Sequence, residues 1–223
     1  MTWPKEYGGA GRSFLERYVV TEELLAAGAP VGCHWIADRQ SGPLLLKFGT
    51  EEQKNRFLPQ IVAGNYFFSI GMSEPDTGSD LASIRTSATK TEGGWLLNGS
   101  KIWTSYAHTN HFMVTLVRSE PASENRHAGM SQMIVDLNDE KVVVTGIKNL
   151  AGEEDFNQVF FDDVFIPDEM VVGTPGNGWE QVMNELGYER SGPERFLSAF
   201  RVLVEFAREI GNDPSDEDRK SVV

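Results

Sequence analysis

Two short segments of the chain carry residue types suited to a planar cofactor with a phosphate tail. Residues 72–80 (MSEPDTGSD) form a run of small and polar residues that directly follows an apolar stretch. Residues 101–106 (KIWTSY) place the large aromatic Trp103 next to the hydroxyls of Thr104 and Ser105. Backbone N–H groups and hydroxyls of a Gly/Ser loop can bind phosphate. An aromatic side chain can cover one face of a ring and a hydroxyl can bond to a ring nitrogen, so the two segments suit one cofactor site.

The composition narrows the classes of partner. A chain of 223 residues can bury one sizeable core or two smaller ones. Its net charge of −13 argues against nucleic acid and anionic membranes, because both require a basic surface. The single cysteine, Cys33, excludes an intrachain disulfide and is expected to be a small buried residue.

Neither a metal site nor a secreted or membrane-spanning protein is expected. The four histidines have no cluster of carboxylates or thiols beside them, so we expect no metal site. The N-terminal segment has no basic stretch followed by an apolar run, and no stretch approaches the roughly 20 apolar residues of a membrane span. We therefore expect a cytoplasmic protein without a secretory signal.

The elements that would position the two segments begin with helices. Residues 13–28 have apolar side chains near helical spacing, and Gly28 supplies a stop signal. Residues 43–48 are predicted to form a short helix. Thr50 and Gln53 form a capping box, which predicts a helix that extends to about Ala63.

From residue 65 the pattern changes to short strands. The Asn98-Gly99 dipeptide is the strongest hairpin signal in the chain, and a second turn is expected at residues 92–94. Eight strands with few helical signals between them predict a compact β-barrel or sandwich. The predicted strands are residues 66–70, 83–91, 94–97, 101–105, 112–118, 132–136, 142–147 and 158–161.

The helical period returns after residue 173, with helices predicted over residues 179–191 and 194–210 and a polar, mobile tail after them. No GxGxxG sequence follows a strand, so a Rossmann fold is not supported. The fold class is therefore predicted to be α+β, in three parts. These are a helical segment (1–65), a β-barrel or sandwich domain (66–172) and the start of a helical bundle (173–223).

Several segments, in this order, resemble the acyl-CoA dehydrogenases, which are flavoenzymes that desaturate acyl-CoA thioesters between the α and β carbons. The resemblance extends to about Ser198 and implies helices, then a β-domain, then a C-terminal helical bundle. The family's usual chain has three domains: N-terminal helices, a β-domain and a C-terminal bundle of helices. Compared with it, we expect this chain to lack the first helices and most of the bundle. Besides residues 72–80 and 101–106, the segments are 3–9 (WPKEYGG), 47–54 (KFGTEEQK), 58–64 (LPQIVAG), 95–103 (WLLNGSKIW) and 160–167 (FFDDVFIP).

The resemblance implies FAD as the cofactor. Residues 70–73 would run along the edge of the flavin ring, and Ser79 would lie at its phosphate end or at the pantetheine of the substrate. Trp103 would cover the ring face away from the substrate, and Ser105 would bond to the ring nitrogen N5. The implied cofactor-binding residues are Ile70, Gly71, Met72, Ser73, Gly78, Ser79, Trp103, Thr104 and Ser105.

The helix predicted from Trp179 carries two charged residues close to its apolar face. Glu189 lies on the flank of that face and Arg190 lies near its centre. Burying either charge without a partner is costly. Periodicity alone leaves an ion pair, with Glu185 or Glu194, as one explanation. The apolar face comprises Val182, Met183 and Leu186.

The resemblance offers a second explanation. Residues 188–190 (YER) look like the segment in which one branch of the family, including the isovaleryl and long-chain enzymes, carries its catalytic glutamate. This implies that Glu189 is the base that removes the α-proton. It also implies that Arg190, Tyr188 and Ser79 contact the acyl-CoA substrate.

The implied reaction converts an acyl-CoA to the trans-2-enoyl-CoA and passes electrons to an electron-transfer flavoprotein. The family also implies a homo-oligomer, or a hetero-oligomer with a related subunit. Two alternatives stay open. The chain is either a non-catalytic shortened subunit or fragment that acts in assembly, or a flavoenzyme of the same fold that uses oxygen.

Overall fold

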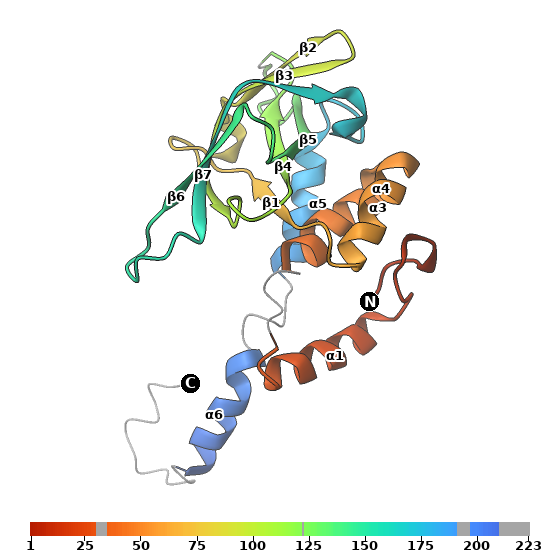
Figure 1. Cartoon of the computed structure of the whole chain (residues 1–223), viewed down its shortest axis with the longest axis vertical. Coiled ribbons are helices and arrows are strands. Elements are labelled where there is room, and N and C mark those ends of the chain that lie inside the picture. Colours follow the sequence, from red (N-terminus) through yellow and green to blue (C-terminus); the bar gives the residue numbers. More distant parts are fainter. Residues whose placement is uncertain (30–34, 122, 191–196, 210–223) are drawn as a thin grey trace.

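The computed structural model describes residues 1–29, 35–121, 123–190 and 197–209 (Figure 1). Cys33 and the predicted mobile tail lie outside these residues, as do the first residues of the helix predicted over 194–210. Among the described residues, no helix is both long and apolar enough to cross a bilayer.

The three helices predicted near the N-terminus are confirmed. Ser13 and Thr50 each accept a hydrogen bond from the backbone N–H three residues later, and the side chains of Glu16 and Gln53 bond back, so both helices begin with a complete capping box. In chain order the elements are the 3-10 turn η1 (Lys5–Tyr7), α1 (Phe14–Ala26), the π-helical turn η2 (Ala37–Ser41), α3 (Gly42–Phe48) and α4 (Glu51–Val62).

The middle of the chain forms one eight-stranded sheet in the order β6-β7-β3-β2-β4-β5-β8, with β1 added beside β4. Most neighbours are antiparallel, but β1 and β2 each pair with β4 in parallel. The predicted β-rich domain is therefore confirmed as a single mixed sheet. Its strands are β1 (Phe68–Gly71), β2 (Ser87–Thr91), β3 (Gly94–Ser105), β4 (Phe112–Arg118), β5 (Met130–Asp136), β6 (Val142–Ile147), β7 (Phe156–Pro167) and β8 (Val171–Val172).

The hairpin predicted at Asn98-Gly99 is wrong. Strand β3 runs straight through this dipeptide, which instead forms an irregularity in the β3–β7 pairing. Gly99 has φ of 136°, and a Cβ on it would lie 2.7 Å from the Cα of Thr86, so a close backbone approach explains the glycine. The hairpin turn lies at residues 92–93, between the paired residues Thr91 and Gly94, where the second turn was predicted.

Other strand boundaries also differ from the prediction. The start of the strand predicted over residues 83–91 belongs to the 3-10 turn η3 (Leu81–Ser83), and β2 begins only at Ser87. The two strands predicted on either side of Asn98-Gly99 are one strand, whereas β8 was not predicted. A second 3-10 turn, η4 (Asp168–Met170), precedes β8.

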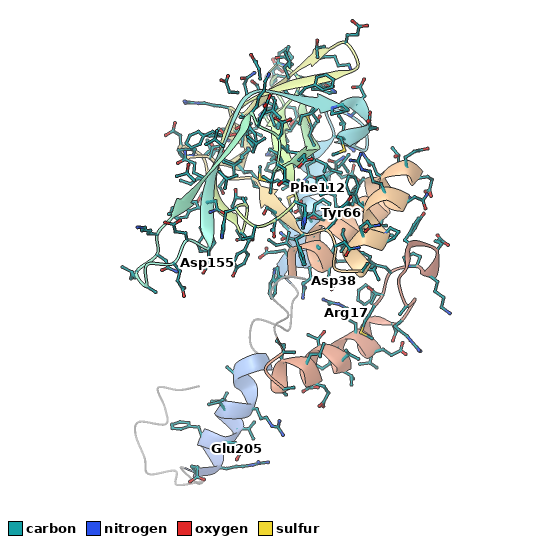
Figure 2. All side chains as sticks on the ribbon, viewed as in Figure 1. Arg17, Asp38, Tyr66, Phe112, Asp155 and Glu205 are labelled. Carbon is teal, nitrogen blue, oxygen red and sulfur yellow. The ribbon has the colours of Figure 1, made fainter. Side chains whose placement is uncertain are left out.

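An aromatic cluster joins the helices to the sheet. The ring of Phe57 in α4 packs edge-on against Phe68 in β1 and Phe112 in β4, with centroid distances of 5.7 Å and 5.2 Å. Tyr66 adds a further edge contact to Phe112 at 5.0 Å, and Figure 2 shows these two side chains where the helices meet the sheet. This packing fixes the helical segment against the end of the sheet that carries β1.

Helix α5 (Gly178–Arg190) packs on β4 and β5 of the sheet and on η2 and α3 of the helical segment. Val182 on its predicted apolar face is fully buried, but Met183 is 55% exposed, so Met183 was wrongly placed on that face. The helix therefore bridges the two parts of the structure.

Helices α1 and α6 (Leu197–Glu209) lie beside each other and away from the sheet (Figure 1). None of the residues of α1 is buried. Arg17 of α1 makes an ion pair with Asp38 of η2 at 2.7 Å, and Figure 2 shows the two residues facing one another across the gap between the ribbons. This ion pair joins α1 to the part of the helical segment that packs on the sheet.

Candidate functional site

A pocket of about 460 Å³ opens where the sheet, the helical segment and α5 meet. It joins residues that are far apart in the sequence. Two segments of the sheet domain, at the end of β1 and the end of β3, form one side, and η2 and α5 form the other. The lining residues are Trp35, Ile36, Gln40, Ile70, Met72, Ser73, Ile102, Trp103, Ser105, Tyr106 and Glu189.

Two aromatic residues of this lining have a strained backbone. Trp103 has φ of 61° and Tyr106 has φ of 56°, in the left-handed region that bulky residues rarely adopt. Such conformations cost about 1–3 kcal/mol each and occur preferentially at functional sites. The Trp103 side chain is 58% exposed and makes a T-shaped contact with the ring of Phe156. The indole of Trp103 therefore lines the pocket while it stays largely open to a ligand.

Two hydroxyls of the lining have no protein partner. The side chains of Ser73 and Ser105 make no hydrogen bond within the described part of the chain. The backbone at Ser105 is fixed, because its carbonyl accepts a hydrogen bond of 2.8 Å from the Ser69 hydroxyl. Asn110 in turn donates to Ser69 at 2.9 Å. The segment that carries the Ser105 hydroxyl is therefore held in place, and both hydroxyls are available to a ligand.

A buried ion pair lies behind the same loop. Lys101 is fully buried, and its Nζ donates to Glu74 Oε1 at 2.8 Å and to the Met72 carbonyl at 3.0 Å. Burial lowers the pKa of Lys101 from 10.5 to about 8, against the opposing effect of the Glu74 carboxylate. Burial acts to raise the pKa of Glu74, but the charge of Lys101 and hydrogen bonds from Lys101, Arg85 and Thr86 outweigh it, so that pKa is lowered. Neither residue was predicted to matter for the site.

Glu189, the predicted base, lines this pocket from α5. It lines the pocket opposite the strand ends that carry Ser73 and Ser105. The preceding carbonyl, that of Tyr188, accepts a hydrogen bond from the buried Arg39 of η2. The end of α5 is thus anchored next to the carboxylate.

A second carboxyl of α5 is buried one helical turn earlier. Glu185 is fully buried and accepts a hydrogen bond of 2.8 Å from the amide of Gln132 in β5. Burial raises the pKa of Glu185 from 4.5 to about 7; the hydrogen bond from Gln132 opposes this rise and the charge of Glu189 adds to it. The second oxygens of Glu185 and Gln132 are both buried without a partner. A proton on Glu185 would supply the donor that this pair lacks.

Several predicted site residues do not line this pocket. Gly71 lies within β1 between two lining residues, and an added Cβ would meet the Met113 side chain at 2.8 Å. Thr104 is fully buried, and its hydroxyl has no hydrogen-bond partner within the described part of the chain. Gly78 and Ser79 are exposed on the loop before η3. The side chain of Arg190 and the whole of Glu194 lie outside the described part of the chain, so the ion pair predicted for them stays a prediction.

Tyr188 faces a different pocket. A cavity of about 550 Å³ between α1, η2, α3 and α5 includes Tyr188 in its lining, together with Arg17 and Asp38. Tyr188, the predicted substrate contact, and Glu189, the predicted base, thus line separate pockets, which is consistent with their adjacent positions on a helix.

The first pocket suits a planar ring with polar edges. Its walls combine aromatic and aliphatic side chains with two hydroxyls that have no protein partner, and a carboxylate stands on the opposite wall. A ligand ring could lie along the indole of Trp103 while its heteroatoms bond to Ser73 and Ser105. These residues fit the flavin that the sequence implies.

Comparison with known proteins agrees with this geometry. Residues 1–65 match the family description "Acyl-CoA dehydrogenase, N-terminal domain", and residues 69–164 match "Acyl-CoA dehydrogenase, middle domain". The chain is 40% identical over 210 residues to acyl-CoA dehydrogenase IpdE1 of Mycobacterium tuberculosis, covering 94% of this chain and 53% of that protein. The chain therefore spans about half the length of the curated relatives it matches.

Solved structures give the same result. A steroid acyl-CoA dehydrogenase described as the Tcur3481-Tcur3483 G363A variant superposes with a TM-score of 0.85 at 36% identity, covering 93% of this chain and 55% of that one. The ChsE4-ChsE5 complex from Mycobacterium tuberculosis superposes with a TM-score of 0.80 at 36% identity, covering 96% of this chain and 55% of that one. Because two adjoining family descriptions and these relatives all coincide, the chain belongs to the acyl-CoA dehydrogenase family.

Proposed function

We propose that this chain forms the flavin and acyl-CoA site of an FAD-dependent acyl-CoA dehydrogenase, which oxidises an acyl-CoA thioester to the trans-2-enoyl-CoA. The observation that carries the proposal is the single pocket in which Ser73, Trp103 and Ser105 of the sheet domain face Glu189 of α5. A reaction between a bound ring and a thioester requires groups that hold the ring on one side and a base on the other side, where the thioester would lie.

Each residue of the pocket has a part in this proposal. The Glu189 carboxylate takes the proton from the α carbon, acting as a general base within reach of the ring site. The Ser73 and Ser105 hydroxyls orient the ring by hydrogen bonds, and Trp103 covers its outer face. FAD, when bound, supplies the acceptor for the hydride that leaves the β carbon.

The substrate and the partners are also part of the proposal. Ser79 and Arg190 are proposed to contact the CoA portion of the substrate, on the resemblance of their segments to the family. Electrons are proposed to pass to an electron-transfer flavoprotein. Because relatives of similar structure are described as steroid enzymes and as a two-protein complex, steroid thioesters belong among the substrates to test and a related subunit among the partners.

The base assignment is tested by Glu189→Gln, which removes the proton acceptor and keeps the size of the side chain. The variant is expected to bind FAD and to lose substrate-dependent reduction of the flavin under anaerobic conditions. Glu180→Gln serves as the control, because Glu180 lies on the same helix, is exposed and, among the described residues, has a side-chain hydrogen bond only from Asn177. Full activity of Glu189→Gln would overturn the assignment, whereas equal losses in both variants would indicate damage to α5 rather than loss of a base.

A further inference from the structure

The buried ion pair of Lys101 and Glu74 ties together three segments around the pocket loop. Glu74 Oε1 accepts hydrogen bonds from Lys101 and from the backbone N–H of Thr86, and Oε2 accepts one from the backbone N–H of Arg85. Strand β3, the loop after β1 and the segment before β2 therefore meet at one carboxylate. A buried charge needs such complete pairing, since an unpaired one is costly.

The second contact of Lys101 acts on the pocket loop itself. Its Nζ donates to the Met72 carbonyl at 3.0 Å, from the inner side of the loop. The Ser73 carbonyl is likewise turned toward the sheet, where it accepts the backbone N–H of Ile102 at 2.9 Å. Met72 and Ser73, which both line the pocket, thus have their carbonyls bonded to β3.

The direction of one backbone donor follows from this arrangement. In a trans peptide the C=O and the following N–H point in opposite directions. The Met72 carbonyl accepts from Lys101, so the Ser73 N–H of the same peptide points away from Lys101, and Ser73 itself lines the pocket. That N–H has no acceptor within the described part of the chain, although buried or half-buried donors are normally paired.

We propose that Lys101 is a positioning residue for the cofactor: it holds the Met72–Ser73 peptide so that the Ser73 N–H donates to an acceptor atom on the edge of the flavin ring. This inference rests on the proposed function. Lys101 does not touch the ring in this role, because the peptide lies between them. Glu74 keeps the ammonium charged and in place.

Variants of the pair separate positioning from simple support of the fold. Lys101→Met removes the donor to Met72 but leaves Glu74 buried and charged, so the double variant Lys101→Met/Glu74→Gln is the informative one. Glu74→Gln alone keeps the Lys101–Met72 bond. Lys90→Met is the matched control, because Lys90 makes an exposed ion pair with Asp168 on the same sheet and lines no part of the pocket.

The measurement is the dissociation constant of FAD for the flavin-free chain, read from flavin fluorescence, together with the thermal midpoint of each variant. Loss of one positioned hydrogen bond is expected to weaken FAD binding by about tenfold in the double variant. Glu74→Gln is expected to lose less, and Lys90→Met to lose nothing. A double variant that folds and binds FAD as tightly as the unmodified chain would overturn the inference.

A second measurement needs no variant. In the 15N-labelled chain, the Ser73 amide resonance is expected to shift on FAD binding and its hydrogen exchange to slow. An unchanged Ser73 amide in an FAD-saturated chain would also overturn the role of Lys101, while leaving the proposed function intact. If the unmodified chain bound no FAD, the proposed function would fail and the positioning role would fail with it.

Discussion

Replacing Glu185 with glutamine is expected to stabilise the chain relative to the unmodified one, and to do so only at pH values where the Glu185 carboxyl is ionised in the unfolded chain. Glu185 is fully buried between α5 and β5, and its partner is the neutral amide of Gln132. Glutamine has the shape of the protonated acid and can bond to Gln132 through both its amide hydrogen and its oxygen. Glu185→Gln should therefore mimic the protonated state at every pH.

The magnitude follows from the displaced pKa. Burial raises the pKa of Glu185 from 4.5 to about 7, and each pH unit between the two values is worth about 1.4 kcal/mol. In this window the unfolded chain has released the proton while the folded chain retains it, so the free energy of unfolding falls as pH rises. The total loss is about 3 kcal/mol, complete just above pH 7 and absent in Glu185→Gln.

The assay is urea unfolding of both chains, followed by tryptophan fluorescence from pH 5.5 to pH 8.5. This range stays above the sequence pI of about 4.7. The stability of Glu185→Gln relative to the unmodified chain should grow by about 2 kcal/mol between pH 5.5 and pH 7 and then stay constant. Glu180→Gln, with its exposed carboxyl, should show no such growth. A difference that is constant over the whole range would refute the protonated, buried state of Glu185.

Three further substitutions test the site and the fold. Trp103→Gly relieves a strained backbone but also removes a half-exposed indole, so the free energy of unfolding, measured in urea, should change by less than about 1 kcal/mol. The affinity for FAD, measured by flavin titration, should fall at least about tenfold because the ring loses its aromatic cover. Gly99→Ala places a Cβ 2.7 Å from Thr86 Cα and should cost about 2–3 kcal/mol in urea unfolding. Gly187→Ala, in α5 with nothing within 4 Å of the added Cβ, should gain up to about 1 kcal/mol by the same assay.

Local signals explain which parts of the fold were predictable. The capping box at Thr50 involves residues three apart, so the start of its helix was predicted correctly. The helix over residues 13–28 was predicted from apolar spacing, and the structure adds a capping box at Ser13. Asn98-Gly99 failed because the same dipeptide suits either a turn or a bulge. The choice depends on the approach of Thr86 from another segment, which no local pattern records.

In the candidate site, too, local motifs were predictable, and contacts between distant segments were not. Trp103 and Ser105 were predicted because a motif carries them, and Glu189 because its neighbours resemble a family segment; all three line the same pocket. The roles of Lys101 and Glu185 depend on partners 27 and 53 residues away in sequence. Lys101 lies in the strand predicted over residues 101–105, and Glu185 lies three residues after Val182 on the apolar face of a predicted helix. Both positions were usable signals for a buried charge. Their partners could not be identified from spacing.

The visible spectrum of the FAD-loaded chain during anaerobic addition of acyl-CoA thioesters tests the central claim most directly. The panel should contain short, branched, long-chain and steroid thioesters. Bleaching of the flavin bands by at least one thioester, with formation of the matching trans-2-enoyl-CoA, is the expected result. A chain that binds FAD but keeps its colour with every thioester, or that stays colourless with added FAD, would contradict the proposed dehydrogenase function.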